Sequence, residues 1–316
     1  MKFDFSVIVL TYYPNKEKLL STIKSILMQK NISYEVLIAD DGSKTFFKED
    51  IEKLMDEYNF TNYKFVEHSQ NQGTVINFYD AVKISEGEIV KPISPGDYLY
   101  SEYTLQTVCG FMKEQNADAT FGNLVYYADD GEIKVFDKKD PINDSIYYNY
   151  EKNDSRKIAK HLIKFSDAIC GAALFYKTSV LKEFLVQVLG TLIYAEDAIT
   201  HYFALAGKKI LKISDFVVYY EYGSGISTSQ SFGSNRIMDD YIRFYNLLIG
   251  KFPKESYLKN VTRRMDLISK KKKICYYSYR LLLLENNYNS VKNKIISKKY
   301  KCSGYDFDFY NKINRN

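Results

Sequence analysis

The feature that most constrains this chain of 316 residues is an alternation in its first hundred positions between short apolar runs and helically spaced apolar residues. Four such runs, each followed by a polar turn, cover 5–10, 34–39, 63–67 and 87–93. Three segments with apolar residues at helical spacing separate them. Strands and helices that alternate over short connections form βαβ units. The sequence therefore predicts an α/β fold, with a mostly parallel sheet flanked by helices.

Polar residues follow each of these four runs, namely Thr11, Asp41, Asn71 and Asp97. Asp97 closes the turn Ser94-Pro95-Gly96-Asp97, in which Pro followed by Gly enforces a tight turn. The carboxyl ends of parallel strands meet at one edge of a sheet, where open α/β sheets bind ligands. We therefore expect these side chains to converge. Each also has a purely structural reading, since Asp is common in turns and at helix N-termini, and the two readings carry equal weight for Asp41.

After Asp97 the alternation loosens and the chain changes character. A hairpin is predicted around 129–131, and Glu196-Asp197 opens a further helix. From about residue 235 the pattern is helical and basic. Residues 251–316 contain 17 Lys and Arg against 5 Asp and Glu, whereas the first 250 contain 27 against 34. The sequence therefore predicts an α/β domain over 1–228 and a basic, mainly helical C-terminal extension over 229–316.

Composition excludes several classes of protein. The four cysteines are scattered without paired spacing, which argues against a zinc site or a disulfide framework and favours a reduced, cytosolic setting. No apolar run reaches the roughly 18 residues of a membrane span, and the N-terminus does not have the pattern of a signal peptide. We therefore expect a cytoplasmic protein.

The extension contains a basic amphipathic stretch, in which Lys270-Lys271-Lys272-Lys273 precedes an apolar and tyrosine-rich run to Leu284. One reading is an interfacial helix that makes the protein peripheral at the inner face of the cell membrane. The other, of equal weight, is a helix that packs on its own domain or on a second copy in a homo-oligomer. Nucleic-acid binding is disfavoured, because no known nucleic-acid module surrounds the patch.

Five motifs occur in the order found in family 2 glycosyltransferases, and together they resemble that family and its GT-A fold. They are Val9-Leu10-Thr11-Tyr12 with Asn15, Ile38-Ala39-Asp40-Asp41-Gly42-Ser43, Asn71-x-Gly73 with Asn77 and Gly87, Ser94-Pro95-Gly96-Asp97, and Glu196-Asp197. The resemblance covers about residues 3–228. It implies an inverting enzyme that moves a sugar from a nucleotide-sugar donor to a hydroxyl of a glycan, glycolipid or glycoprotein acceptor, in the synthesis of cell-surface polysaccharide.

The resemblance also implies a role for the matched positions at the sheet edge. Thr11, Tyr12 and Asp41 would hold the nucleobase and ribose of the donor, for which a UDP-sugar is the first expectation. Asn71 would line the nucleotide pocket. Asp97 would act at the diphosphate, directly or as the ligand of a divalent cation, Mn²⁺ or Mg²⁺.

Glu196-Asp197 matches the acidic pair that supplies the catalytic base, so that Asp197 would deprotonate the acceptor hydroxyl. The structural alternative is that acidic residues simply favour the first turn of a helix. His201 lies one helical turn further on, and its default interpretation is a packing residue. Residues 224–229, which are rich in Ser and Gly, are equally well read as a mobile lid over the diphosphate and as a plain linker.

Two positions depart from the family pattern. Gly96 stands where relatives carry the main metal-binding carboxylate, and Ile76 stands where they often have an Arg near the phosphates. The alternative function is therefore a catalytically degraded relative that acts as a glycan-binding or scaffold subunit. A nucleotidyltransferase is a third hypothesis. It would need a Gly-rich loop with Lys or Arg after the first strand, which Thr11-Tyr12-Tyr13-Pro14 does not provide.

Overall fold

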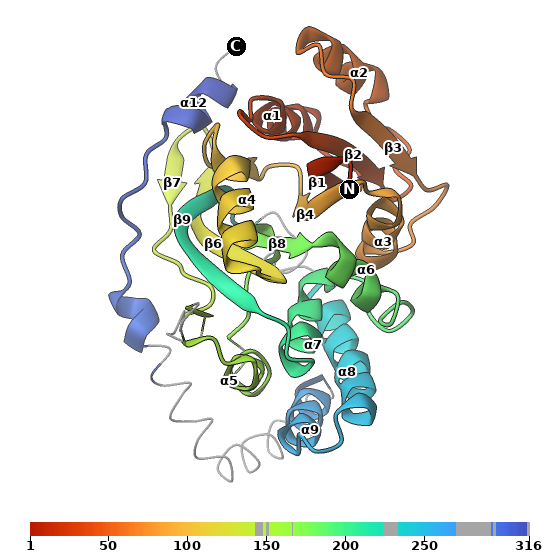
Figure 1. The fold of residues 1–316 in the computed structure, drawn as a ribbon, viewed down its shortest axis with the longest axis vertical. Coiled ribbons are helices and arrows are strands. Elements are labelled where there is room, and N and C mark those ends of the chain that lie inside the picture. Colours follow the sequence, from red (N-terminus) through yellow and green to blue (C-terminus); the bar gives the residue numbers. More distant parts are fainter. Residues whose placement is uncertain are drawn as a thin grey trace.

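The computed structural model describes residues 1–142, 148–149, 152–165, 167–223, 233–269, 292 and 295–314, and shows a central sheet with helices packed around it (Figure 1). The strands are β1 (Phe3–Thr11), β2 (Tyr34–Asp40), β3 (Tyr63–Glu67), β4 (Gly87–Ile93), β5 (Tyr98–Leu99), β6 (Ala119–Asp129), β7 (Ile133–Val135), β8 (Leu174–Lys177) and β9 (Ile210–Glu221). The longer helices are α1 (Lys16–Leu27), α2 (Lys48–Glu57), α3 (Thr74–Ile84), α4 (Thr104–Gln115), α6 (Thr178–Leu185), α8 (Gly233–Lys251) and α9 (Tyr257–Ser269). The shorter ones are α5 (Ser155–Ala159), η3 (Lys160–Lys164), η4 (Gly171–Ala173), η5 (Glu196–Ala198), α7 (Ile199–Leu205) and α12 (Asp308–Asn314).

The sheet has the strand order β3-β2-β1-β4-β8-β6-β9-β5, and β7 pairs with β6. The first four strands are parallel, as the sequence predicts. The strand β8 is antiparallel to both β4 and β6, and β6 and β9 are parallel to each other. The C-terminal ends of β1, β2, β4, β6 and β9 therefore lie at one edge. The α/β fold class is confirmed, with a mixed second half to the sheet.

The strands β1 and β2 lie inside the sheet and are covered on both faces. All seven residues of β2 are buried, and so are the last seven of β1, which is typical of parallel strands covered on both sides. The predicted hairpin is present as the antiparallel pair β6 and β7, with Gly131 in the turn at φ +96°. The N-terminus of α1 is capped by Asn15, whose side chain accepts from the backbone N–H of Lys18 at 2.9 Å.

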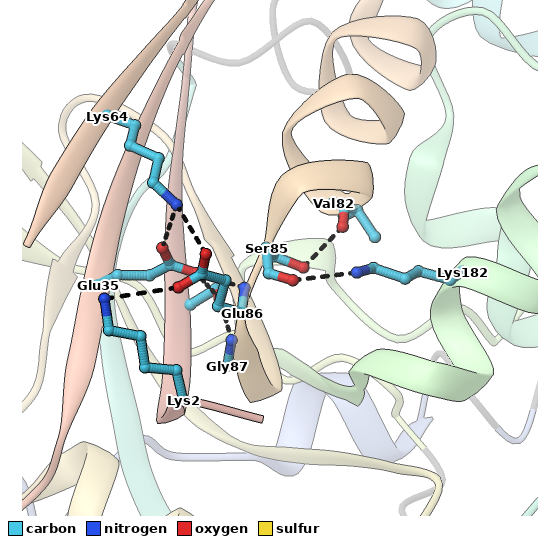
Figure 2. A network of polar contacts seen from close by, with 9 residues as sticks. Lys2, Glu35, Lys64, Val82, Ser85, Glu86, Gly87 and Lys182 are labelled. Atoms are coloured by element: carbon cyan, nitrogen blue, oxygen red, sulfur yellow. Dashed lines mark hydrogen bonds and ion pairs between the residues drawn. The ribbon is translucent and has the colours of Figure 1, made fainter.

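A polar cluster at the opposite edge fixes the start of β4 against β1 and β2 (Figure 2). The buried Glu35 carboxylate accepts from the Ser6 hydroxyl and from the backbone N–H of Glu86, both at 2.6 Å. Lys64 reaches the same carboxylate at 3.4 Å. A side chain on Gly87 would place its Cβ 2.2 Å from the backbone N of Ser6, so only glycine lets the two strands approach this closely.

The helical C-terminal part packs on the same apolar core as the sheet. Phe244, Tyr245 and Leu248 of α8 and Leu258 of α9 are fully buried in it. At the other side of the molecule, the last segment runs outside β7 and β9 to α12, which buries Tyr310 and its neighbours against aromatic residues of β5, β6 and β9 (Figure 1). The division at residue 228 stays a prediction.

The predicted lid or linker at 224–229 and the basic stretch at 270–284 lie outside the described residues. Among the helices that are described, none is long and apolar enough to cross a bilayer. Whether the extension contacts a membrane or a second subunit therefore stays a prediction.

Candidate active site

The loops that follow β1 and β2 are joined by a short series of hydrogen bonds. The Asp40 carboxylate accepts from the Ser43 backbone N–H at 2.7 Å and from its hydroxyl at 2.6 Å. That hydroxyl in turn accepts from the backbone N–H of Tyr13 at 2.6 Å. The backbone N–H of Asp41 donates to the carbonyl of Thr11 at 3.0 Å. The second motif therefore fixes the first loop.

The two predicted donor-binding residues of the first loop differ in exposure. The Thr11 hydroxyl is buried, and within the described part of the chain it has no hydrogen-bond partner. Tyr12 is 52% exposed, and its ring packs edge-on against Tyr13 with centroids 4.8 Å apart. Of the two, Tyr12 is the side chain that a ligand in solution can reach directly.

Asp41 is buried and holds the loop that follows β3. Its Oδ1 accepts from the Gln72 backbone N–H at 2.7 Å, and its Oδ2 accepts from that of Gly73 at 2.9 Å. The His68 ring is a third partner, with Nδ1 3.2 Å from Oδ1. A carboxylate offers about four acceptor positions, so roughly one remains for a ligand. Asn71, in the loop that Asp41 holds, is exposed.

Asp97 lies at the same edge but is buried. Its Oδ1 accepts from the backbone N–H of Glu221, at the end of β9, at 3.1 Å. Thr22 of α1 holds the turn, because its hydroxyl donates to the Asp97 carbonyl at 2.9 Å and accepts from the Gly96 backbone N–H at 3.0 Å. Burial raises the pKa of the Asp97 carboxyl to about 7.

A fully buried lysine, Lys91 of β4, lies within electrostatic reach of Asp97. Its Nζ donates to the carbonyl of Ala172 and, at 3.4 Å, to that of Leu174, and it lies 4.6 Å from the ring centroid of Phe175. Burial lowers the pKa of this ammonium group to about 7. Lys91 therefore holds the η4 segment.

The carboxylates of Glu196 and Asp197 lie against η4 and are partly buried. A Cβ on Gly171 would lie 3.2 Å from Glu196 Oε1 and 3.3 Å from the Cβ of Asp197, which leaves little room for a side chain. Burial raises the pKa of both carboxyls, and for Glu196 the charge of Asp197 adds to the effect. The nearby backbone N–H groups of Ala198, Asp197 and Gly171 favour the charged form and oppose the rise. Asp197 therefore belongs to a pair of carboxyls with raised proton affinity.

The thiol of Cys170 lies within electrostatic reach of both Asp97, which follows β4, and Asp197 of η5. Burial, together with the charges of Asp140, Asp197 and Asp97, raises the pKa of this thiol to about 12. Asp97 and Asp197 are 100 positions apart in the sequence. None of these residues lines the cavity of about 640 Å³ between α4, β9 and residues 300–304.

The segment that leads into Glu196 is held by Asp240 of α8, a residue that sequence reasoning missed. One oxygen of this fully buried carboxylate accepts from the backbone N–H groups of Ile193, Tyr194 and Ala195, at 3.0, 2.6 and 3.0 Å. The other oxygen pairs with Arg243. The helix pattern around Asp240 carries no signal for this contact.

His201 is a buried packing residue, in agreement with its default interpretation. Its ring stacks on Tyr241 and Tyr245 of α8, and its Nδ1 lies 3.1 Å from the Tyr245 hydroxyl. Burial lowers its pKa to about 3, so the ring is neutral at physiological pH. His68, which carried no predicted role, is the histidine at the candidate site. Its position directly after the third strand is a signal that was available in the sequence.

Comparison with known proteins decides the family. The model of "Glycosyl transferase family 2" matches residues 6–184, which is more than half of the chain. The chain belongs to glycosyl transferase family 2.

The chain is also similar to a curated protein and to solved structures. A poly(ribitol-phosphate) beta-glucosyltransferase of Bacillus spizizenii is 28% identical over 220 residues, covering 68% of this chain and 32% of that protein. The chain therefore spans about a third of the length of this curated relative. Crystal structures of S. aureus TarS 1-349 share the fold. The complex with UDP-GlcNAc has a TM-score of 0.55 at 20% identity, and the match covers 82% of this chain and 70% of that one. The complex with UDP has a TM-score of 0.52 at 19% identity, and the match covers 82% of this chain and 69% of that one. The GT-A fold is thereby confirmed.

Members of family 2 commonly use a divalent cation. No group of three or more His, Cys, Asp and Glu that could hold a metal occurs among the described residues. The Asp97 carboxylate already accepts from the Glu221 backbone N–H, and the charges within its reach are those of Lys91 and the Glu221 carboxylate. This set does not fit a cation held by protein ligands alone. A metal ligated by Asp97 stays a prediction.

Proposed function

We propose that this family 2 member is an inverting glycosyltransferase that uses a UDP-sugar and has Asp197 as its catalytic base. The observation that carries the proposal is the position of Asp197: a partly buried carboxylate with a raised pKa, at the sheet edge where Asp97 and the loops of β1 to β3 also lie. A carboxylate with raised proton affinity is a better general base than one in water, provided that it is still ionised at working pH.

The proposed reaction is a single displacement. The acceptor oxygen attacks the anomeric carbon of the donor sugar as its proton passes to the Asp197 carboxylate. The bond between the anomeric carbon and the phosphate oxygen breaks on the opposite side, and the nucleoside diphosphate leaves with the electron pair. The anomeric configuration is inverted. Nearby backbone N–H groups of Ala198 and Gly171 favour the ionised form of Asp197, which this proton transfer needs.

The loops after β1, β2 and β3 support a nucleotide donor. They form one hydrogen-bonded unit through Asp41, and the half-exposed Tyr12 offers an aromatic face at its rim. The TarS structures with the same fold hold UDP and UDP-GlcNAc. We therefore place a uridine nucleotide across Tyr12, Asp41 and Asn71, with its diphosphate toward Asp97.

We take the acceptor to be a hydroxyl of a cell-surface polymer or its lipid-linked precursor, reached from the cytoplasmic side. The Bacillus relative, by its name, glucosylates poly(ribitol phosphate), which is a hydroxyl-rich phosphate polymer. A polymer of that class is the first acceptor to test.

The experiment is a transfer assay. The protein is incubated with UDP-glucose, UDP-GlcNAc and other nucleotide sugars, with and without Mn²⁺, together with poly(ribitol phosphate) and a pool of glycan acceptors, and release of UDP is measured. We expect turnover that depends on the acceptor, and an α-linked donor should give a β-linked product. If no nucleotide sugar is turned over but UDP still binds, the degraded, non-catalytic alternative replaces this proposal.

A further inference from the structure

The segment 190–195, which leads into the catalytic pair, is held by a nest-like cluster of three backbone amides. The N–H groups of Ile193, Tyr194 and Ala195 point at one oxygen of Asp240, at 3.0, 2.6 and 3.0 Å. Successive N–H groups that converge in this way form a concavity suited to a negative charge. Here the charge comes from the protein itself.

Both carboxylate oxygens of Asp240 have hydrogen-bond donors. The carboxylate is fully buried, and its second oxygen pairs with Arg243, whose Nε donates to the carbonyl of Thr191 at 3.0 Å. Asp240 and Arg243 therefore bind the backbone of the 190–195 segment from Thr191 to Ala195. A buried charge is tolerated only when it is paired and hydrogen-bonded in this manner.

The same segment touches the loop that Asp41 holds. The carbonyl of Ile193 accepts from the backbone N–H of Val75 at 3.0 Å. Gly73, at φ +92°, lies against Ile193, because a Cβ there would fall 2.4 Å from Cγ2 of the isoleucine. Hydrogen bonds therefore run from Asp41 through 72–75 to Ile193, and the chain continues from Ala195 into Glu196 and Asp197.

We propose that Asp240 is a positioning residue for sugar transfer. It fixes the 190–195 segment, so that Asp197 keeps a constant position relative to the loop that follows β3. This rests on the proposed function, in which Asp197 is the base. The helix that carries Asp240 lies beyond the residues matched by the family model. Small displacements of a reacting group cost large factors in rate, so the effect should be on turnover rather than on donor affinity.

The test compares Asp240→Asn with two matched variants. The amide keeps the size of the side chain but loses the charge that serves three N–H groups. Arg243→Gln removes the ion pair and the hydrogen bond to the Thr191 carbonyl, and leaves in place the three hydrogen bonds from backbone N–H groups to Asp240. Asp239→Asn makes the same chemical change as Asp240→Asn, at the exposed neighbouring residue. For each variant, kcat, KM for the acceptor, UDP affinity by calorimetry and Tm are measured on the full chain. Hydrogen–deuterium exchange of the peptide over 191–197 is followed as well.

We expect Asp240→Asn to lower kcat by about 10- to 100-fold, with UDP affinity within threefold of wild type and faster exchange over 191–197. Arg243→Gln should have a smaller effect and Asp239→Asn none. If kcat falls only in proportion to the folded fraction, or stays within twofold while exchange rises, Asp240 has a structural role and the inference is wrong. If wild type transfers no sugar, the proposed function fails. In that case, faster exchange over 191–197 in Asp240→Asn still supports the positioning contact, and unchanged exchange rejects it.

Discussion

The Asp41 carboxylate accepts a hydrogen bond from the backbone N–H of Gly73 at 2.9 Å, and so joins the motif after β2 to the motif after β3. Two stretches that look independent in the sequence are therefore parts of one site. A side chain on Gly42 would meet the backbone of Gln70 at 2.6 Å, which shows how closely the two loops approach.

Replacing Asp41 with Asn should weaken donor binding. An amide oxygen without charge holds the N–H groups of Gln72 and Gly73 less strongly, and hydrogen bonds to a charged acceptor contribute about 1.5–3 kcal/mol each. We expect UDP affinity to fall by roughly tenfold or more, measured by calorimetry. Asp130→Asn, in the exposed β6–β7 turn, is the control. Unchanged affinity in Asp41→Asn would show that this loop does not hold the nucleotide.

Exchanging Asp197 for Asn should remove the base without emptying the donor site. Loss of general-base catalysis lowers rates by about 10²- to 10⁴-fold. We expect a fall in kcat of this size, with UDP affinity retained. Glu196→Gln should keep most of the activity, because burial and the neighbouring charge already favour a protonated Glu196. If the two variants lose activity equally, the roles within the pair are not as proposed.

The pH dependence of kcat/KM should reflect the raised pKa of Asp197. The base must be ionised, so activity is lost as pH falls, and burial moves this acidic limb above the ordinary range of an aspartate, about 3.9. A profile from pH 4.5 to 9 checks the position of the limb. Glu196→Gln should leave it almost in place, because burial, and not the charge of Glu196, is the cause of the rise. A limb near pH 4 in wild type would contradict this.

Replacing Lys91 tests whether the η4 segment, which lies against Asp197, matters for catalysis. Lys91→Met keeps the length and the packing on Phe175 but frees the carbonyls of Ala172 and Leu174. We expect kcat to fall by roughly tenfold or more, because η4 carries Gly171. The Tm at pH 7 should fall as well, because the carbonyls of Ala172 and Leu174 lose a hydrogen-bond donor. A fall in Tm without a change in kcat would assign Lys91 to stability alone.

His201 should make the protein acid-sensitive. Its folded-state pKa is lowered to about 3, whereas the unfolded chain titrates near 6.5, so the unfolded state binds the extra proton as pH falls. The stability is present above pH 6.5 and is lost below it, by about 2 kcal/mol between pH 7 and pH 5. His201→Phe keeps a ring between Tyr241 and Tyr245 and should flatten the dependence of unfolding free energy on pH. Parallel curves for both proteins would refute the assignment.

Local patterns predicted the elements that depend on them. The four parallel strands and the hairpin at 129–131 follow from apolar runs and turn residues. These patterns predict the structure correctly because each depends on a few consecutive residues. Whether Thr11, Tyr12, Asp41, Asn71 and Asp97 contact the donor stays a prediction.

Other parts of the site depend on contacts between distant segments. Asp240 lies in an ordinary amphipathic helix, and Lys91 in an apolar strand, so neither has a neighbour in the sequence that indicates its partner. The same holds for Asp97, whose partner is the backbone of Glu221, 124 positions away. Burial and pairing of this kind are tertiary properties, and single-sequence patterns do not encode them.

The aromatic contacts of α12 change what a deletion experiment can mean. Tyr127 donates its hydroxyl to the Gly96 carbonyl at 2.7 Å, and its ring lies 5.3 Å from that of Tyr310. One side chain thus separates the last described helix from the turn that carries Asp97. Truncating the tail to study membrane or subunit binding would also disturb the donor site. Charge-neutralising substitutions at Lys270 to Lys273, with the end of the chain left intact, separate the two effects.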